Sequence, residues 1–233
     1  MNSPPALTLV YLCYNEQENI AAALDEGLAY CNADLTDWEI VVVDDGSSDR
    51  SVAIVNEYVE REPRIRLVQH PKNKGMGGAM ATGIAHATKP TFVFLPSDLQ
   101  VEAAELRKMV PLLNGAEIIL TVYARRPSSV FRAIMSRTFR DFLMVSANIH
   151  FQLEGLYLFP TELGKELLSQ VKGDTFFFSF QLVQLAIERG VRTASTTIVC
   201  KPRLAGASKV ANPKRIRQVV TEVFAYRARR GLE

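Results

Sequence analysis

Residues 38–49 constrain the fold of this chain more than any other segment. They read WEIVVVDDGSSD, a β-branched run without polar alternation that ends at two carboxylates, a glycine and two serines. Such a run is typical of a strand that is buried on both faces of a parallel sheet. Ligands of open α/β sheets bind beside the carboxyl ends of the strands. Asp44 and Asp45 are therefore candidates for a ligand site, and the alternative is an acidic turn in which Ser48 or Asp49 caps the next helix.

Strand-like and helix-like segments alternate along the chain. The pattern predicts strands at 6–12, 40–43, 65–68, 91–95, 117–123, 156–159 and 196–199. The helix-like segments between the first five strands predict right-handed crossovers and a mainly parallel sheet. The first of these helices is expected to begin at Asn15, capped together with Glu18. We expect one α/β domain whose central sheet is flanked by helices, with a less regular second half.

The composition is that of an ordinary globular protein. The 233 residues are 48% hydrophobic and 22% charged, which suits one large domain. No stretch approaches the roughly 18 apolar residues of a membrane-spanning helix, and residues 1–5 do not resemble the start of a secretory signal. Cys13, Cys31 and Cys200 have no Cys-x-x-Cys spacing, which argues against a disulfide framework or a zinc site and favours a reducing cytosol.

Positive charge is concentrated in the second half, although the net charge is only +2. Residues 125–140 contain five Arg and no acid, and residues 201–233 contain nine Lys or Arg against two Glu. Such a bias suggests an anionic partner: a phosphate group, a membrane surface or nucleic acid.

Two further polar loops are candidates for ligand binding. One follows the first predicted strand, and the other precedes the helix after the third predicted strand. Tyr14 and Glu16 follow the first strand, where Tyr14 offers a flat face for stacking a base; the alternative is a plain helix start. Residues 73–78 read NKGMGG, and such glycines let backbone approach a ligand closely before a helix whose N-terminus attracts phosphate. Because this loop has neither the Walker nor the Rossmann spacing, it is a weak phosphate signal by itself.

Residues 95–100 read LPSDLQ at the end of the fourth predicted strand. The carboxylate of Asp98 and the amide oxygen of Gln100 are two residues apart and can face one hard cation. Mg²⁺ usually takes one or two protein carboxylates together with substrate phosphate oxygens. The alternative is that Asp98 caps the following helix. The three histidines lie in unlike contexts and are interpreted as structural: His70, His86 and His150.

A basic helix is predicted after residue 127. It carries Arg132, Ser136 and Arg140 on one face, because they recur at i, i+4 and i+8, and aromatic side chains flank them. A cationic stripe beside aromatics suits a phosphate on an apolar chain. The alternative is a solvated basic face over a packed one.

The motifs follow one another in a defined order. They are Tyr-Asn-Glu at 14–16, Val-Val-Asp-Asp-Gly-Ser-Ser-Asp at 42–49, Asn-x-Gly-x-Gly-x-Ala at 73–79 and Ser-Asp-Leu-Gln at 97–100. This order and spacing resemble family 2 glycosyltransferases of the GT-A fold, and within that family the polyprenyl-phosphate glycosyltransferases such as dolichol-phosphate mannose synthase. The resemblance covers roughly residues 6–210.

The resemblance implies a donor site for a nucleoside-diphosphate sugar. The residues implied in nucleotide-sugar binding are Tyr14, Glu16, Asp44, Asp45, Lys74, Gly75 and Ser97. Asp98 matches the last acid of the family's Asp-x-Asp metal motif and Gln100 an accessory ligand, for Mg²⁺ or Mn²⁺. Pro96 stands where the first acid of that motif is expected, and Leu12 stands where the family usually has proline.

The resemblance also implies a site for the phosphate of a lipid acceptor. Arg132 and Ser136 resemble the phosphate-binding segment of the polyprenyl-phosphate enzymes. Their Arg-x-x-Gly-x-Ser-Lys signature is matched by residues 203–209, in which Arg203, Ser208 and Lys209 are the implied phosphate-binding residues. Asp98, through the metal, and Arg203 are the implied catalytic residues, because they offset charge on the departing diphosphate.

We therefore expect transfer of a sugar from a nucleoside-diphosphate sugar to a polyprenyl-phosphate acceptor, with inversion. Residues 1–124 are the expected donor half, 125–210 the acceptor half and 211–233 a basic C-terminal helix. Contact with a peripheral membrane surface or a membrane-anchored partner, at the cytoplasmic face, is expected through 125–144 and the C-terminal helix. No nucleic acid partner is expected.

Two alternatives stay open. A sugar hydroxyl as acceptor requires a base, for which Glu154 is the candidate. A non-catalytic nucleotide-binding or scaffold protein of the same fold is suggested by Pro96 in place of an acid.

Overall fold

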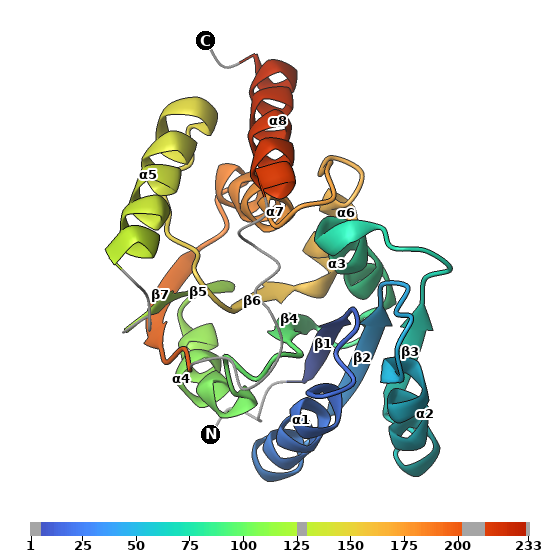
Figure 1. Ribbon diagram of the computed structural model, residues 1–233. Helices are drawn as coiled ribbons and strands as arrows, with labels where there is room; N and C mark the ends of the chain where they lie inside the picture. The colour runs from blue at the N-terminus through green and yellow to red at the C-terminus, as the bar shows by residue number, and fades with distance from the viewer. Residues whose placement is uncertain (1–5, 125–129, 202–212, 232–233) are drawn as a thin grey trace.

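The computed structural model describes residues 6–124, 130–201 and 213–231, without the side chains of 130–137, 140, 213 and 215. Its described part contains a seven-stranded sheet with helices on both faces (Figure 1). The strands are β1 (Leu7–Cys13), β2 (Trp38–Asp44), β3 (Ile65–Gln69), β4 (Thr91–Pro96), β5 (Ile118–Tyr123), β6 (Tyr157–Pro160) and β7 (Thr193–Ile198). The helices are α1 (Ile20–Asp34), α2 (Ser51–Arg61), α3 (Gly75–His86), η1 (Ala103–Glu105), α4 (Leu106–Met109), η2 (Val110–Asn114), α5 (Val130–Ala147), α6 (Thr161–Leu167), α7 (Phe177–Glu188) and α8 (Pro213–Arg230).

The strand order of the sheet is β3-β2-β1-β4-β6-β5-β7. β1 pairs in parallel with β2 and β4, β2 pairs in parallel with β3, and β5 pairs in parallel with β7. β6 runs antiparallel to both of its neighbours, β4 and β5. The predicted α/β architecture with a mainly parallel sheet is therefore confirmed.

Both faces of the sheet are buried, which explains the unbroken apolar run of β2. Ile40 and Val42 belong to a core that is covered by α1, α2 and α4. Val41 and Val43 belong to a second core beneath α3, α6 and α7. All four side chains are fully buried, and each such burial stabilises the fold by about 1.5–3 kcal/mol. The two groups of helices lie on opposite sides of the sheet in Figure 1.

A third apolar cluster joins α5, α7 and α8. Its buried members are Leu143, Ala147, Ile149, Phe177, Phe180, Val219, Val223 and Tyr226. α8 packs against both α5 and α7, and Figure 1 shows α5 and α8 standing together beyond the sheet. The ring of Tyr226 meets Phe177 edge-on at 5.6 Å between centroids. This cluster fixes α8 on the body of the protein.

Helix α1 begins later than predicted. Its first residue is Ile20, and Asn15 has a left-handed backbone with φ of 52°. The Oδ1 atom of Asn15 accepts the backbone N–H of Ser48 at 2.8 Å. The expected cap by Asn15 and Glu18 is therefore wrong, because the Asn15 side chain is engaged by the loop that follows β2.

Candidate functional site

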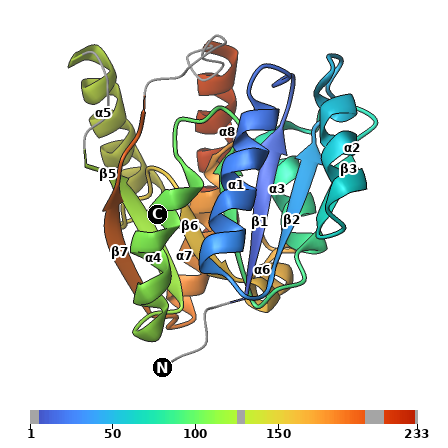
Figure 2. The ribbon, with the colours of Figure 1, turned by 90° about the horizontal axis from the view of Figure 1, so that it is seen from below.

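The ends of three adjacent strands bring the predicted donor residues together. β1 lies between β2 and β4, with Cys13 level with Asp44 and Leu12 level with Pro96. Because these strands are parallel, the loops that follow them leave the sheet at the same end; Figure 2 shows this for β1 and β2. Three predicted site residues begin those loops: Tyr14, Asp45 and Ser97.

The serines that follow the two carboxylates hold the loop after β1. The Ser47 hydroxyl accepts the backbone N–H of Asn15 at 2.9 Å, and the Ser51 hydroxyl accepts the backbone N–H of Glu16 at 2.9 Å. Together with the bond from Ser48 to Asn15, these contacts join the loops after β1 and β2. The acid-glycine-serine motif thus sets the position of the Tyr14–Glu16 loop.

Tyr14 and Glu16 occupy different surroundings within that loop. The Glu16 carboxylate accepts the side-chain amide of Asn19 at 2.9 Å, just ahead of α1. The Glu16 carbonyl oxygen accepts the N–H groups of Asn19 and Ile20. Glu16 therefore orders the start of α1. Tyr14 is partly exposed beside the ends of β1 and β2.

Asp44 is buried at the end of β2, with a side chain that is only half satisfied. Its Oδ2 atom accepts the backbone N–H of Ser47 at 3.1 Å. Its Oδ1 atom is buried and has no hydrogen-bond partner among the described residues. Leaving such an oxygen unpaired costs about 1–3 kcal/mol. A ligand N–H or O–H placed here would satisfy it.

Asp45 ties the end of β2 to the glycine loop. One carboxylate oxygen, Oδ1, lies 2.8 Å from His70 Nδ1 and accepts the backbone N–H of Lys74 at 2.7 Å. The other ring nitrogen of His70 lies 2.9 Å from the Thr82 hydroxyl in α3. His70 was predicted to be structural, and its structural role is to hold a predicted site residue. The sequence feature that could have indicated this role is the position of His70 directly after β3, at the same end of the sheet as Asp45.

The glycines of the loop before α3 accommodate a neighbouring piece of backbone. Gly75 has a left-handed φ of 80°, and a Cβ atom there would lie 2.6 Å from the Asp174 carbonyl oxygen. A Cβ atom on Gly77 would lie 2.3 Å from the Gly173 carbonyl oxygen. Close packing of this kind accounts for both glycines, whether or not a phosphate binds. Lys74 is exposed at the start of α3.

The loop after β4 contains the predicted metal ligands. The buried Ser97 hydroxyl donates to the Leu12 carbonyl oxygen at 2.9 Å and so joins the ends of β4 and β1. The Asp98 carboxylate accepts the backbone N–H of Gln100 at 3.2 Å. Between them, Leu99 has a left-handed φ of 59°, which is a strained conformation for a leucine. Asp98 therefore stabilises this tight turn, and η1 begins only at Ala103.

Asp98 suits a metal that takes most of its ligands from substrate. Among the described residues, no three His, Cys, Asp or Glu side chains gather into a group that could hold a metal ion. Mg²⁺ is commonly bound by one or two carboxylates together with phosphate oxygens. A single carboxylate at Asp98 fits that pattern when a diphosphate is present.

Cys13 also lies at this edge, at the end of β1. Burial is the largest influence on its thiol and raises the pKa of Cys13 to about 12. The thiol therefore stays protonated at neutral pH, which excludes Cys13 as a thiolate nucleophile. The chemistry of this edge is that of carboxylates and backbone N–H groups.

The segment that leads toward Arg203 is fixed beside the turn after β4. The backbone N–H of Lys201 donates to the Gln100 carbonyl oxygen at 2.7 Å, and its ammonium group pairs with Glu102. The predicted residues Arg203, Ser208 and Lys209 lie outside the described residues. Two others, Arg132 and Ser136, lie in α5, which confirms the predicted helix, but their side chains are not described.

Helices α5 and α8 each carry two exposed large apolar side chains among the residues described. They are Met144 and Val145 on α5, and Ile216 and Phe224 on α8. The ring of Phe224 contacts Phe142 of α5 edge-on, with 6.0 Å between centroids. In the ranges 6–124, 130–201 and 213–231, no helix combines the length and apolar character needed to cross a membrane.

Two arginines in the last turn of α8 contact the protein itself. Arg229 donates to the buried side chain of Gln181 at 3.2 Å, and Arg230 pairs with Glu188 at 2.5 Å. Both partners belong to α7. These two arginines of the C-terminal helix, for which membrane contact was expected, thus help to hold α8 on α7.

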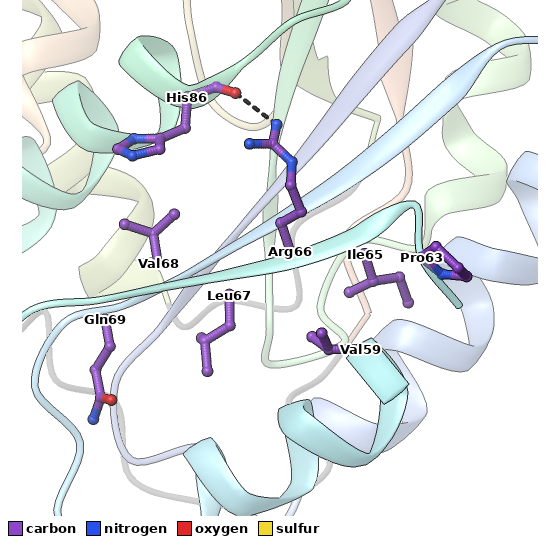
Figure 3. Close-up of a pocket in the computed structure, with 8 residues that line it drawn as sticks. All are labelled: Val59, Pro63, Ile65, Arg66, Leu67, Val68, Gln69 and His86. Atoms are coloured by element: carbon purple, nitrogen blue, oxygen red, sulfur yellow. Dashed lines mark hydrogen bonds between the residues drawn. The ribbon is translucent and has the colours of Figure 1, made fainter. Parts of the chain in front are cut away.

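A shallow pocket of about 600 Å³ lies at the lateral edge of the sheet that β3 forms (Figure 3). It is lined by Val59, Pro63, Ile65, Arg66, Leu67, Val68, Gln69 and His86. Arg66 is already engaged, because it pairs with Glu39 at 2.7 Å and donates to the His86 carbonyl oxygen at 2.8 Å. The lining includes none of the predicted site residues, so this pocket is separate from the candidate site.

Comparison with known proteins agrees with this geometry. The family described as "Glycosyl transferase family 2" matches residues 8–184. An undecaprenyl-phosphate 4-deoxy-4-formamido-L-arabinose transferase of Pectobacterium carotovorum is 34% identical over 134 residues, which are 57% of this chain and 41% of that protein. A dolichyl-phosphate beta-glucosyltransferase of Trichomonas vaginalis is 28% identical over an alignment of 211 positions that covers 82% of this chain and 62% of that protein. The chain thus spans less than two thirds of the length of these relatives.

Solved structures support the same fold. A glucosyl-3-phosphoglycerate synthase from Mycobacterium tuberculosis, crystallised with Mn²⁺, UDP and phosphoglyceric acid, superposes with a TM-score of 0.74. The superposition covers 96% of this chain and 78% of that chain at 17% sequence identity. The sheet is thus that of a GT-A fold. Together with the family match over most of its length, this places the chain in glycosyltransferase family 2.

Proposed function

We propose that this chain transfers a sugar from a nucleoside-diphosphate sugar to a polyprenyl phosphate, with inversion at the anomeric carbon. The observation that carries the proposal is the buried Oδ1 of Asp44, which has no hydrogen-bond partner in the described part of the chain and lies at the strand end beside the Tyr14 loop. A nucleoside brings the N–H and O–H groups that such an oxygen accepts. Membership of the family supports the reaction. The relatives named for undecaprenyl and dolichyl phosphate support the acceptor class.

The donor site would use the strand-end loops in separate roles. Tyr14 stacks on the base, and Asp44 accepts a hydrogen bond from the nucleoside. Asp45, held by His70 and Lys74, fixes the loop that faces the donor. Lys74 and Gly75 at the start of α3 lie on the diphosphate side, where the helix N-terminus favours negative charge. A uridine nucleotide is the first candidate, because the mycobacterial synthase of the same fold was crystallised with UDP.

A divalent cation, Mg²⁺ or Mn²⁺, fits beside Asp98. In this proposal Asp98 is the protein carboxylate that holds it, with Gln100 as an accessory ligand and Ser97 fixing the turn. When bound, the cation supplies positive charge that stabilises the departing diphosphate. Arg203 would add a second positive charge that offsets the charge of the departing diphosphate.

The acceptor phosphate would be bound by cationic and hydroxyl groups of the second half: Arg132, Ser136, Arg203, Ser208 and Lys209. A phosphate oxygen is already anionic at neutral pH, so its attack on the sugar needs no strong general base. Glu154, the candidate base for a hydroxyl acceptor, accepts the backbone N–H of Tyr123 at 3.2 Å at the end of β5. This engagement in the fold favours the phosphate acceptor.

A lipid acceptor requires contact with a membrane surface or with a membrane-anchored partner. The exposed side chains of Val145 on α5 and Phe224 on α8 suit insertion into the boundary of a bilayer. Exposed Lys214 and Arg217 on α8 add positive charge for anionic headgroups. Nucleoside-diphosphate sugars and the reduced thiols both suit the cytoplasmic face.

A thermal-shift panel tests the donor half of this proposal. UDP, GDP and their common sugar conjugates are added to the chain with and without Mn²⁺. A ligand that binds only the folded state raises Tm. At a ligand concentration one hundred times Kd, the free energy of unfolding increases by about 2.7 kcal/mol. We expect one base to raise Tm, and Mn²⁺ to enlarge the rise. Failure of every nucleotide to raise Tm would contradict the proposed donor site.

A further inference from the structure

The segment 172–175 joins the C-terminal helix to the glycine loop. It enters α7 through Thr175 and contacts α8 on one side and residues 75–77 on the other. Gln181 holds its first residue, because the side-chain amide donates to the Lys172 carbonyl oxygen at 2.7 Å. The segment is thus fixed at its start. Its remaining contacts connect it to α8 and to the glycine loop.

On the α8 side, one carboxylate makes the connection. Glu222 Oε1 accepts the backbone N–H of Asp174 at 2.9 Å, and Oε2 accepts the Thr175 hydroxyl. Gly173 has a φ of 118°, and a Cβ atom there would lie 2.6 Å from Glu222 Oε2. The backbone of the segment is therefore shaped around this carboxylate. Hydrogen bonds to an ionised acceptor are stronger than neutral ones.

On the other side, the same segment supports the glycine loop. The backbone N–H of Gly77 donates to the Asp174 carbonyl oxygen at 3.0 Å. The Cα atoms of Gly75 and Gly77 lie so near residues 173 and 174 that neither position has room for a Cβ atom. Asp174 thus uses its N–H toward α8 and its carbonyl oxygen toward α3.

The glycine loop in turn reaches the strand-end carboxylates. Its Lys74 N–H donates to Asp45 Oδ1, next to His70 Nδ1 on the same oxygen. Hydrogen bonds therefore join Glu222 to Asp174 and Asp174 to Gly77, the backbone of residues 74–77 continues the connection, and the hydrogen bond from Lys74 reaches Asp45.

We infer that Glu222 is a positioning residue for the donor site and that it links the seating of α8 to nucleotide binding. The inference rests on the proposed function for its ligand. While α8 is packed against α5 and α7, Glu222 holds Asp174. Asp174 in turn holds the glycine loop in the conformation that binds nucleotide. Because such coupling is reciprocal, a bound nucleotide also strengthens the seating of α8. A contact that changes the packing of α8 would therefore change the nucleotide affinity of the donor site.

The chain offers a matched control for this role. Glu188 is a second carboxylate that secures α8, through Arg230 at 2.5 Å, but it belongs to α7, and among the described residues no hydrogen bond or ion pair joins it to 172–175. Glu188→Ala therefore loosens α8 without touching the connecting segment. Glu222→Ala removes both contacts to the segment. Glu222→Gln keeps the size and one acceptor oxygen, so it is the conservative variant.

Two measurements decide the matter. Amide hydrogen exchange of residues 73–78, without ligand, is expected to rise about tenfold in Glu222→Ala and to stay at the wild-type rate in Glu188→Ala. The Kd for UDP, or for whichever nucleotide the wild type binds best, is expected to rise about tenfold in Glu222→Ala alone. In Glu222→Gln, the exchange rate of residues 73–78 and the Kd for the nucleotide should both lie closer to wild type than to Glu222→Ala. If Glu222→Ala does not fold, the intermediate exchange rate expected of Glu222→Gln carries the test.

The outcomes separate this inference from the proposed function. Equal exchange and equal Kd in Glu222→Ala and wild type would overturn the positioning role. Equal increases in the Glu222 and Glu188 variants would overturn it too, because they would reflect loosening of α8 in general. If the wild type binds no nucleotide, the proposed function fails, and the exchange rates still decide whether Glu222 positions the loop.

Discussion

His70 Nδ1 and Asp45 Oδ1 lie 2.8 Å apart, both buried, at the point where β2 and β3 end. The same carboxylate oxygen accepts the backbone N–H of Lys74. This pair joins the strand-end carboxylates to the loop before α3. A buried histidine thereby holds one carboxylate of the candidate donor site in place.

His70→Ala should weaken nucleotide binding and lower stability. The change removes the contacts with Asp45 and Thr82 and leaves buried polar groups short of partners, which typically costs about 1–3 kcal/mol. Urea unfolding and a nucleotide titration measure the two effects. His86→Ala is the control, because the exposed His86 ring contacts only a carbonyl oxygen of its own helix among the described residues. Similar losses in both variants would argue against the role of the Asp45 contact.

Asp44→Asn should separate binding from folding. Asparagine keeps the size of the side chain and an oxygen that can accept the Ser47 N–H. It also removes a buried charge whose Oδ1 has no partner among the described residues. We therefore expect Tm without ligand to stay within a few degrees of wild type and the nucleotide-induced rise in Tm to vanish. An unchanged ligand-induced rise would remove Asp44 from the donor site.

Gly77→Ala should destabilise the protein through the segment 172–175. Its new Cβ atom would lie 2.3 Å from the Gly173 carbonyl oxygen, so backbone has to move. Overpacking of this kind costs about 1–3 kcal/mol. Gly115→Ala is the control, because a Cβ atom there meets its nearest atom at 3.9 Å. Equal free energies of unfolding for the two variants would contradict the close packing described for the glycine loop.

Acid should destabilise the protein partly through Glu39. Burial opposes ionisation of Glu39, but hydrogen bonds from Thr8, Thr88 and Arg66 outweigh it and lower the pKa of its carboxyl group. A lowered folded-state pKa gives stability that is present above the unfolded value of about 4.3 and lost as pH falls below it. Glu39→Gln should therefore be less stable than wild type at pH 7 and show a shallower loss on acidification.

Urea unfolding at a series of pH values measures that difference. The control is Glu57→Gln, which removes a surface ion pair at 3.6 Å and is expected to leave the acid limb unchanged. A wild-type slope in Glu39→Gln would show that Glu39 does not contribute to acid sensitivity.

Val145→Asp and Phe224→Asp should reduce sedimentation with anionic vesicles. Each places a carboxylate on an exposed apolar position of α5 or α8, where both burial in the bilayer boundary and attraction to anionic lipid are weakened. Asn56→Asp adds the same charge to the exposed face of α2 and serves as the control. Equal vesicle binding by all three variants would exclude α5 and α8 as the membrane contact.

Much of the fold follows from the sequence because burial leaves a clear pattern. The run Ile40–Val43 predicts a strand with two buried faces, and the structure places alternate residues in two different cores. The gathering of Tyr14, Asp45 and Ser97 follows from parallel strands that share one edge. These features depend on local pattern and on general rules of sheet topology.

Other features depend on contacts between distant segments and leave no local pattern. The antiparallel direction of β6 follows from its neighbours and not from its own four residues. Asn15 has the sequence of a helix cap, yet Ser48 engages its side chain. The glycines at 75 and 77 suggest a phosphate loop, whereas their nearest neighbours are the carbonyl oxygens of residues 173 and 174.

The central claim is that the acceptor is a polyprenyl phosphate. The most direct test incubates the protein with a radiolabelled sugar nucleotide chosen by the thermal-shift panel, Mg²⁺ or Mn²⁺, and undecaprenyl phosphate in mixed micelles. We predict label in the organic-extractable lipid fraction, dependent on the lipid phosphate and greatly reduced by Asp98→Asn. Label that appears only on soluble glycans, or transfer that is unaffected by omitting the lipid phosphate, would contradict the account.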